Sequence, residues 1–186
     1  MIKDIIQFIL ANINFNGNSN DDDSNRRFCF SAASCDILKS MLGIRKYSSK
    51  ISSTLFDELL QSFGDLIIVG NVSMVDSAHY ASCVESIIVE YPREFTESQK
   101  IKMLDLFEDF FLERSKNCFE KVQLHLITAL NYLTSILAFD SIELFRKLAN
   151  TISGKLLNLF STNNNEYLKV SFTPLYLLYN SQRLKF

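Results

Sequence analysis

The sequence predicts an all-α protein, and three observations lead to that prediction. Only 5 glycines and 2 prolines occur among the 186 residues, and these residue types are the strongest interrupters of regular structure. Apolar residues recur every three or four positions along most of the chain, which is the spacing of a helix face. With 47% hydrophobic and 22% charged residues, the composition also excludes a disordered or collagen-like chain. We therefore predict a single domain over residues 1–186, built from roughly seven antiparallel helices.

Four of these helices are predicted in the first half of the chain. Residues 1–13 are too short, and too acidic near their start, for a signal peptide, so they are interpreted as an amphipathic helix. Residues 14–27 are rich in asparagine and aspartate and are predicted to form a mobile loop. The other three helices are expected at about residues 28–42, 54–68 and 77–90, where apolar residues follow the helical spacing.

The boundaries of these helices carry residues that begin or end helices. Gly43 is placed to end the second helix, and the polar residues 46–53 are expected to connect it to the third. Residues 67–69 are β-branched and could belong to a buried strand, but Gly70 directly after them favours the end of a helix. Asp76 is predicted to cap the fourth helix.

The fifth predicted helix has the clearest start signal. Thr96 and Gln99 have the spacing of a capping box, in which each side chain satisfies a backbone N–H at the helix start. Apolar and charged residues then follow at helical spacing, which predicts one face toward the core and another toward solvent. The predicted core face carries Ile101, Leu104, Phe107 and Phe111, and the opposite face carries Lys100, Asp105, Glu108 and Asp109.

The longest stretch without Lys, Arg, Asp or Glu runs from Val122 to Phe139. This length approaches that of a membrane-spanning helix. The stretch nevertheless contains six polar residues, which are Gln123, His125, Thr128, Asn131, Thr134 and Ser135. We therefore interpret residues 118–138 as a central helix that its neighbours bury, rather than as a membrane span.

Two more helices are predicted after this central helix. Asp140 and Glu143 repeat the cap spacing ahead of a helix over residues 141–160. Pro174 suits the first turn of a short last helix, because proline needs no backbone N–H at that position. The chain then ends on apolar residues 184–186 without an evident polar cap, which favours one piece of a longer array.

Residues 122–160 contain two consecutive predicted helices joined by a turn. The first contains Leu130, Leu133 and Leu137, the turn falls at residues 139–140, and the second carries the segment Phe145-Arg146-Lys147-Leu148-Ala149. This pattern resembles a helical hairpin of the HEAT or armadillo repeat families and covers about forty residues. The resemblance implies an α-solenoid segment, in which stacked hairpins bind a partner protein or peptide along a helical face and no residue is catalytic.

A compact bundle around the central apolar helix is the alternative architecture. In that case the chain is similar to viral Bcl-2-like proteins, which hold a hydrophobic central helix and a groove for an amphipathic partner helix. Both architectures imply a protein that binds another protein.

Motifs for chemistry are absent from the sequence. No phosphate-binding glycine loop, nucleophile elbow, zinc-protease motif or calcium-binding loop occurs, so no cofactor, metal or catalytic residue is expected. His79 has Asp76 three residues before it and Cys83 four residues after it, which places all three near one helix face. A Cys–His pair can act as a nucleophile, but a core cysteine beside a half-buried histidine is the interpretation we prefer. The protein is therefore predicted not to be an enzyme.

Two groups of charged residues are the candidate partner-binding residues. The acidic residues Asp105, Glu108 and Asp109 could face a basic partner, and the basic residues Arg146 and Lys147 could contact an acidic peptide. A net charge of −2 argues against nucleic acid as the main partner, because such binding needs a positive surface. We predict a non-enzymatic interaction or scaffold module that belongs to a larger assembly as a subunit or fragment. The sequence leaves the oligomeric state of the module open.

The four cysteines are Cys29, Cys35, Cys83 and Cys118, and no two of them form a C-x-x-C pair. Without metal-ligand spacing they are predicted to be free thiols. Free thiols are typical of a reducing compartment, so an intracellular location in cytoplasm or nucleus is expected.

Overall fold

Helices are the only regular secondary structure among the residues that the structure describes. The computed structural model describes residues 2–13, 21–69, 74–91, 93–110 and 120–148, and no strand occurs within them. The all-α prediction is therefore confirmed for this part of the chain. The predicted helix after Pro174 lies outside the described residues, as does the helix of residues 141–160 beyond residue 148.

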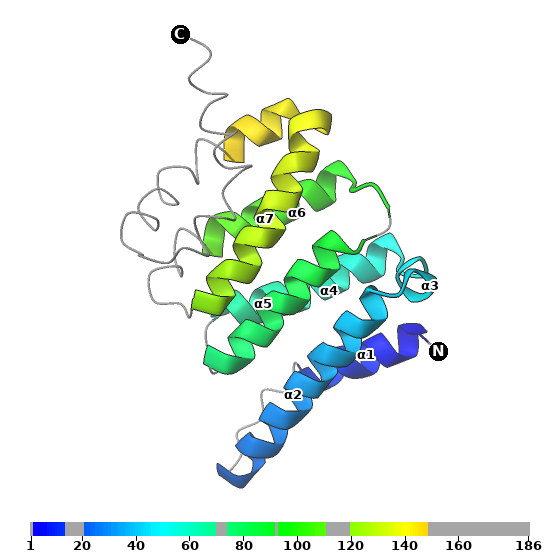
Figure 1. Cartoon of the computed structure of the whole chain (residues 1–186), viewed down its shortest axis with the longest axis vertical. Helices are drawn as coiled ribbons and strands as arrows, with labels where there is room; N and C mark the ends of the chain where they lie inside the picture. Colours follow the sequence, from blue (N-terminus) through cyan, green and yellow to red (C-terminus); the bar gives the residue numbers. More distant parts are fainter. Residues whose placement is uncertain (1, 14–20, 70–73, 92, 111–119, 149–186) are drawn as a thin grey trace. The chain divides into compact units, whose positions relative to one another are not determined.

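The described helices follow one another with short connections (Figure 1). Their bounds are α1 (Ile2–Ile13), α2 (Asp21–Leu42), α3 (Arg45–Ser48), α4 (Ser53–Val69), α5 (Met74–Val89), α6 (Glu97–Asp109) and α7 (Glu120–Asp140). Residues 142–148 are also helical, and we call them the 142–148 helix. Residues 67–69 close α4 as helix, as their position before Gly70 predicted.

The second helix begins earlier than the sequence predicted. α2 starts at Asp21, so the prediction of a loop was wrong for residues 21–27, while residues 14–20 lie outside the described residues. Three aspartates, Asp21 to Asp23, occupy the first turn of α2. Negative charge at a helix N-terminus is favoured by the helix dipole, which explains why this acidic segment is helical.

Three other boundaries differ from the predictions in detail. The predicted connector of residues 46–53 overlaps the single-turn helix α3, which begins at Arg45 and ends at the buried Ser48, and the last residue of the connector already belongs to α4. Asp76 lies inside the first turn of α5 rather than at its cap, a position where the dipole again favours an acid. Asp140 is the last residue of α7, and Ser141 separates it from the 142–148 helix.

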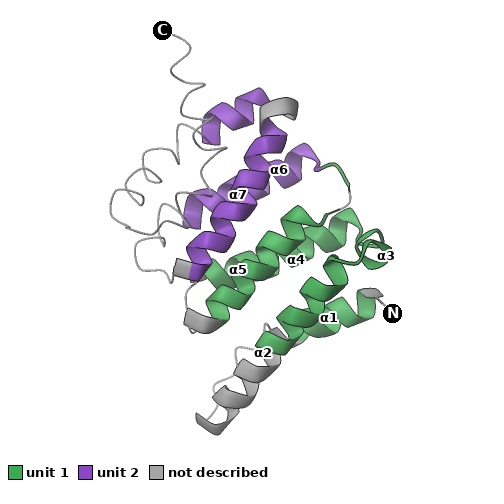
Figure 2. Cartoon of the chain, in the orientation of Figure 1, with its two compact units in different colours: residues 1–94 green, residues 95–186 purple. Residues whose placement is uncertain are grey.

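The contacts of the chain divide it into two compact units, residues 1–94 and residues 95–186 (Figure 2). The sequence predicted one domain over the whole chain. Two units of contacts can still unfold together, so the single domain stays a prediction.

Helix packing in unit 1 joins two helical hairpins. The consecutive helices α1 and α2 pack together, as do α4 and α5. The two hairpins then meet twice, through α1 against α4 and through α2 against α5, and α3 packs on α2. Any contact between α2 and α4 is less extensive than these among the described residues. Corresponding helices of the two hairpins are therefore neighbours.

The core of unit 1 contains two tilted aromatic pairs. The ring centroids of Phe63 on α4 and Tyr80 on α5 are 5.9 Å apart. Those of Phe56 on α4 and Tyr91, which follows α5, are 4.3 Å apart. Such pairs add to the free energy of apolar burial. Both phenylalanines are fully buried, so the α4–α5 contact is the apolar centre of this unit.

Unit 2 is organised around α7, which packs against α6. Along α7 the apolar residues are buried on one broad face, while most described residues on the opposite face are only partly buried, so the predicted central helix is confirmed as a helix with one buried face. The fully or almost fully buried residues are Val122, Leu126, Ile127, Ala129, Leu130, Leu133 and Leu137. Within the described ranges no helix is both long and apolar enough to cross a membrane.

Candidate functional site

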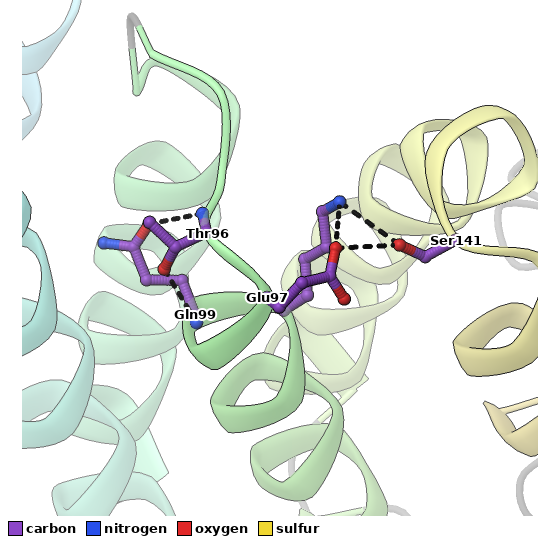
Figure 3. Close-up of polar contacts among 5 residues, drawn as sticks. Thr96, Glu97, Gln99 and Ser141 are labelled. Atoms are coloured by element: carbon purple, nitrogen blue, oxygen red, sulfur yellow. Dashed lines mark hydrogen bonds and ion pairs between the residues drawn. The ribbon is translucent and has the colours of Figure 1, made fainter.

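The surface that holds the predicted partner-binding residues begins at the N-terminus of α6. The predicted capping box is present there (Figure 3). The Gln99 backbone N–H donates to the Thr96 hydroxyl at 3.3 Å, and the Thr96 backbone N–H donates to the Gln99 side-chain oxygen at 3.0 Å. Because both orphan N–H groups are satisfied, the first turn of α6 has a defined position.

A three-residue polar cluster joins this first turn to the 142–148 helix (Figure 3). The Lys100 ammonium donates to the Glu97 carboxylate at 2.9 Å and to the Ser141 hydroxyl at 3.3 Å. The Ser141 hydroxyl in turn donates to the same Glu97 oxygen at 3.0 Å. Ser141 also precedes the 142–148 helix, where its carbonyl oxygen accepts from the Phe145 N–H at 3.0 Å. The cluster therefore fixes the start of one helix to the start of the other.

The position of Lys100 corrects the predicted faces of α6. Lys100 was predicted on the solvent face, but only 6% of its side chain is exposed, whereas 63% of the Glu97 side chain is exposed. Ile101, predicted in the core, is exposed instead, while Leu104 and Phe107 are buried as predicted. The physical reason is that the long Lys100 stem packs inward and its charge still reaches a carboxylate and a hydroxyl.

The buried face of the 142–148 helix also differs by one residue from the prediction. Phe145 and Leu148 are buried, but Ile142, at the same predicted periodicity, has 51% of its surface exposed. Ser141, rather than Ile142, faces α6 at this end, because its hydroxyl is held by Glu97 and Lys100.

Asp105 and Lys147 form an ion pair at the other end of the same two helices. The Lys147 ammonium lies 3.8 Å from the Asp105 carboxylate, and each side chain is about half exposed. Since Ser141 contacts the first turn of α6 and Lys147 contacts Asp105 eight residues farther on, the two helices run parallel and side by side. An exposed pair of this kind contributes only about 0–1 kcal/mol to stability.

The remaining predicted partner-binding residues lie on these two helices as well. Asp109 and Arg146 are exposed, and Glu108 is half-buried. We define the charged face by six of the charged residues on α6 and the 142–148 helix, which are Glu97, Asp105, Glu108, Asp109, Arg146 and Lys147. The structure thus brings the acidic and the basic candidates together on one unit, where the sequence treated them as separate groups.

The charged face has three acids close together on α6. Asp105, Glu108 and Asp109 lie in the second half of α6, and no basic residue occupies its last described turn. Lys147 compensates one of these charges from the neighbouring helix. The pairing depends on tertiary structure, so the sequence spacing of α6 by itself contained no signal for it.

Replacing Glu97 by glutamine is expected to make the free energy of unfolding fall less as the pH is lowered. The pKa of Glu97 is held below its ordinary value, chiefly by the hydrogen bond from Lys100 and then by that from Ser141. The folded state therefore binds this proton less tightly than the unfolded state does. Glu97 stabilises the fold at pH values above its ordinary pKa. That contribution disappears as the pH falls through its lowered pKa in the folded state.

Urea unfolding between about pH 6 and about pH 3 measures this difference. Glu97→Gln should give a shallower fall in the free energy of unfolding with acid than the unmodified chain. Glu94→Gln changes an exposed glutamate outside the cluster and serves as the matched control. Equal acid slopes for the two variants would show that the Glu97 contacts are not made in solution.

The histidine–cysteine arrangement does not have the properties of a catalytic nucleophile. Cys83 is fully buried, whereas His79 is only partly buried. The Cys83 thiol donates to the carbonyl oxygen of Cys35 at 3.7 Å. Burial raises the pKa of the Cys83 thiol well above its ordinary value. A reactive cysteine needs an accessible thiol with a lowered pKa, so this geometry argues against the Cys83/His79 enzyme hypothesis.

Metal ligands are likewise not assembled in the part of the chain that the structure describes. There, no three His, Cys, Asp or Glu side chains are grouped so that they could hold an ion.

Comparison with known proteins identified no relative of this chain. No protein-family model matches the chain, and no curated protein or solved structure shows significant similarity to it. The resemblance to HEAT or armadillo hairpins therefore stays a prediction, and the function is inferred from the contacts of the chain's own residues.

Proposed function

We propose that the chain is a non-enzymatic interaction module that binds a protein or peptide partner along the charged face. The observation that carries this proposal is the parallel placement of α6 and the 142–148 helix, which gathers exposed charges of both signs on one surface. A partner with complementary charges gains orientation and association rate from such a surface.

The finer architecture that we propose is a stack of helical hairpins. In such a stack, the first helix of one hairpin contacts the first helix of the next, and the second helices do likewise. The contacts α1–α4 and α2–α5 in unit 1 follow this pattern. An up-and-down four-helix bundle would instead make α2 and α4 principal neighbours, since they are consecutive long helices. This difference supports the array over the Bcl-2-like bundle.

Unit 2 is consistent with the same arrangement. α6 and α7 form one hairpin, and the 142–148 helix is the next helix after it. The side-by-side contact of α6 with the 142–148 helix corresponds to the contact between first helices of successive hairpins. The face of a stack along which first helices align is an extended surface, which suits a peptide or a subunit of a larger assembly.

A charge swap tests the function while preserving the fold. The double variant D105K/K147D exchanges the members of the ion pair, so an attraction remains between the two helices while the pattern that a partner meets is inverted. A partner that pairs with either group would meet like charges, which destabilise an interface. We expect partner affinity to fall by about tenfold or more, corresponding to about 1.4 kcal/mol or more.

The matched control is D36K/K39D, which exchanges two charged residues of α2 in unit 1. Proteins captured by the immobilised full chain would be identified by mass spectrometry, and their affinities would then be measured for all three chains. Weakened binding by the charged-face swap alone supports the proposal. Equal affinities for the three chains would place the binding surface elsewhere and reject the charged face.

A further inference from the structure

Two cysteines lie where the hairpins of unit 1 pack together. Cys35 belongs to α2 and Cys83 to α5, two helices that contact each other. Both residues are free thiols and fully buried. The Cys83 thiol donates to the carbonyl oxygen of Cys35 at 3.7 Å, so its sulfur lies against the backbone of the cysteine on the opposite helix. Neither residue is used by the charged face, which belongs to unit 2.

The usual spacing of packed helices is compatible with a bond between the two cysteines. Packed helix axes are usually about 8–10 Å apart. With Cα atoms about 2.3 Å from each axis, facing Cα atoms are then roughly 3.5–5.5 Å apart. That range overlaps the separation of about 4.4–6.8 Å found across disulfides.

The surroundings of Cys83 raise the pKa of its thiol. Burial is the main reason that the pKa of Cys83 is raised, and a hydrogen bond with the Cys35 side chain is the next contributor. A raised pKa keeps the Cys83 thiol protonated at neutral pH. It therefore reacts slowly, and the pair remains reduced until an oxidant reaches it.

We propose that Cys35 and Cys83 are a disulfide-forming pair that covalently joins α2 to α5 when the protein meets hydrogen peroxide. When the α2–α5 contact opens transiently and admits peroxide, Cys35 attacks it as the thiolate. The O–O bond breaks to give a sulfenic acid and hydroxide, and the hydroxide takes up the proton lost by the thiol and becomes water. The second thiol then attacks the sulfenic sulfur, the S–S bond forms, and a second water leaves. Two thiols are oxidised while one peroxide is reduced to two waters.

This bond would act as an oxidative lock between the two hairpins of unit 1. The two cysteines are 48 positions apart in sequence. A cross-link over a loop of that length restricts the unfolded chain and lowers the unfolding equilibrium constant by roughly a thousandfold, provided that native geometry accepts the bond. The lock stabilises the α2–α5 contact without changing the residues of the charged face.

The test uses the full chain with Cys29→Ser and Cys118→Ser, so that Cys35 and Cys83 are the remaining cysteines. Circular dichroism of the reduced variant checks its helix content against the unmodified chain. After incubation with hydrogen peroxide and unfolding, we expect the number of titratable thiols to fall from two to none. The intact mass should fall by two hydrogen atoms, and a reductant should restore both thiols. The oxidised form should also unfold at a higher temperature than the reduced form.

Two further chains make the result decisive. The same background with Cys83→Ser should form no intramolecular bond. In the unmodified chain, cleavage after Phe30 separates Cys29 from Cys35, so a cross-linked peptide pair containing Cys35 and Cys83 identifies the bond without any substitution. Oxygen addition without an S–S bond, cross-links only between chains, or a lowered unfolding temperature would each overturn the proposal.

Discussion

Replacing Phe63 by alanine is expected to destabilise the protein by about 3–5 kcal/mol. The Phe63 side chain is fully buried on α4 and its ring packs against Tyr80 of α5. The substitution removes apolar contacts and leaves a cavity that the packed helices can close only in part. Since small proteins are stable by about 5–15 kcal/mol, this single change removes a large fraction of the total.

Urea unfolding followed by circular dichroism measures the loss. Phe8→Ala is the matched control, because it deletes the same side chain from α1 at a position where 59% of the surface is exposed. Most of the apolar area of Phe8 is already in water, so its removal should cost much less. Similar losses of unfolding free energy for the two variants would contradict the assignment of Phe63 to the buried core.

Replacing Leu130 by alanine is expected to cost about 2–5 kcal/mol. Leu130 is fully buried in the middle of α7, the helix around which unit 2 is organised. The neighbouring residues on the same face of α7 are themselves buried. Close packing limits how far they can move into the space that the leucine leaves.

Ile142→Ala is the matched control in the same unit, since Ile142 is half exposed and loses an equal number of methylene or methyl groups. The expected order is a large loss of unfolding free energy for Leu130→Ala and a small one for Ile142→Ala. Equal losses would contradict the assignment of Leu130 to the buried face of α7.

The two core variants together test the single-domain prediction. Phe63 belongs to unit 1 and Leu130 to unit 2. If the whole chain unfolds as one domain, each substitution lowers the midpoint of the same transition seen by every probe. Two transitions, each shifted by only one of the substitutions, would show that the units unfold separately.

The helices could be predicted because their signals are local. Thr96 and Gln99 satisfy each other's backbone groups within one turn, so their spacing predicted the start of α6. Gly43 follows the last residue of α2, as a residue suited to ending a helix should. Residues 21–27 differ from the prediction because asparagine and aspartate are common in loops, whereas acids in a first helical turn are stabilised by the dipole.

The candidate site could be predicted only as a list of residues. The sequence named Asp105 and Lys147 as charges on different helices, and no property of either helix indicated that they form an ion pair. Lys100 was assigned to the solvent because charged residues are mostly exposed. Its actual position depends on Glu97 and on Ser141, which is 41 residues away in sequence.

The sequence by itself therefore determined that the described chain is helical, where most helices begin and end, and that α7 has a buried face. These properties follow from spacing, caps and hydrophobicity, which act within a few residues. Only the tertiary structure decided that α1 contacts α4, that the Cys83 thiol lies against the Cys35 backbone, and that Asp105 of α6 pairs with Lys147 of the 142–148 helix. Such pairings depend on how helices pack side by side, and no local pattern in the chain encodes the neighbour.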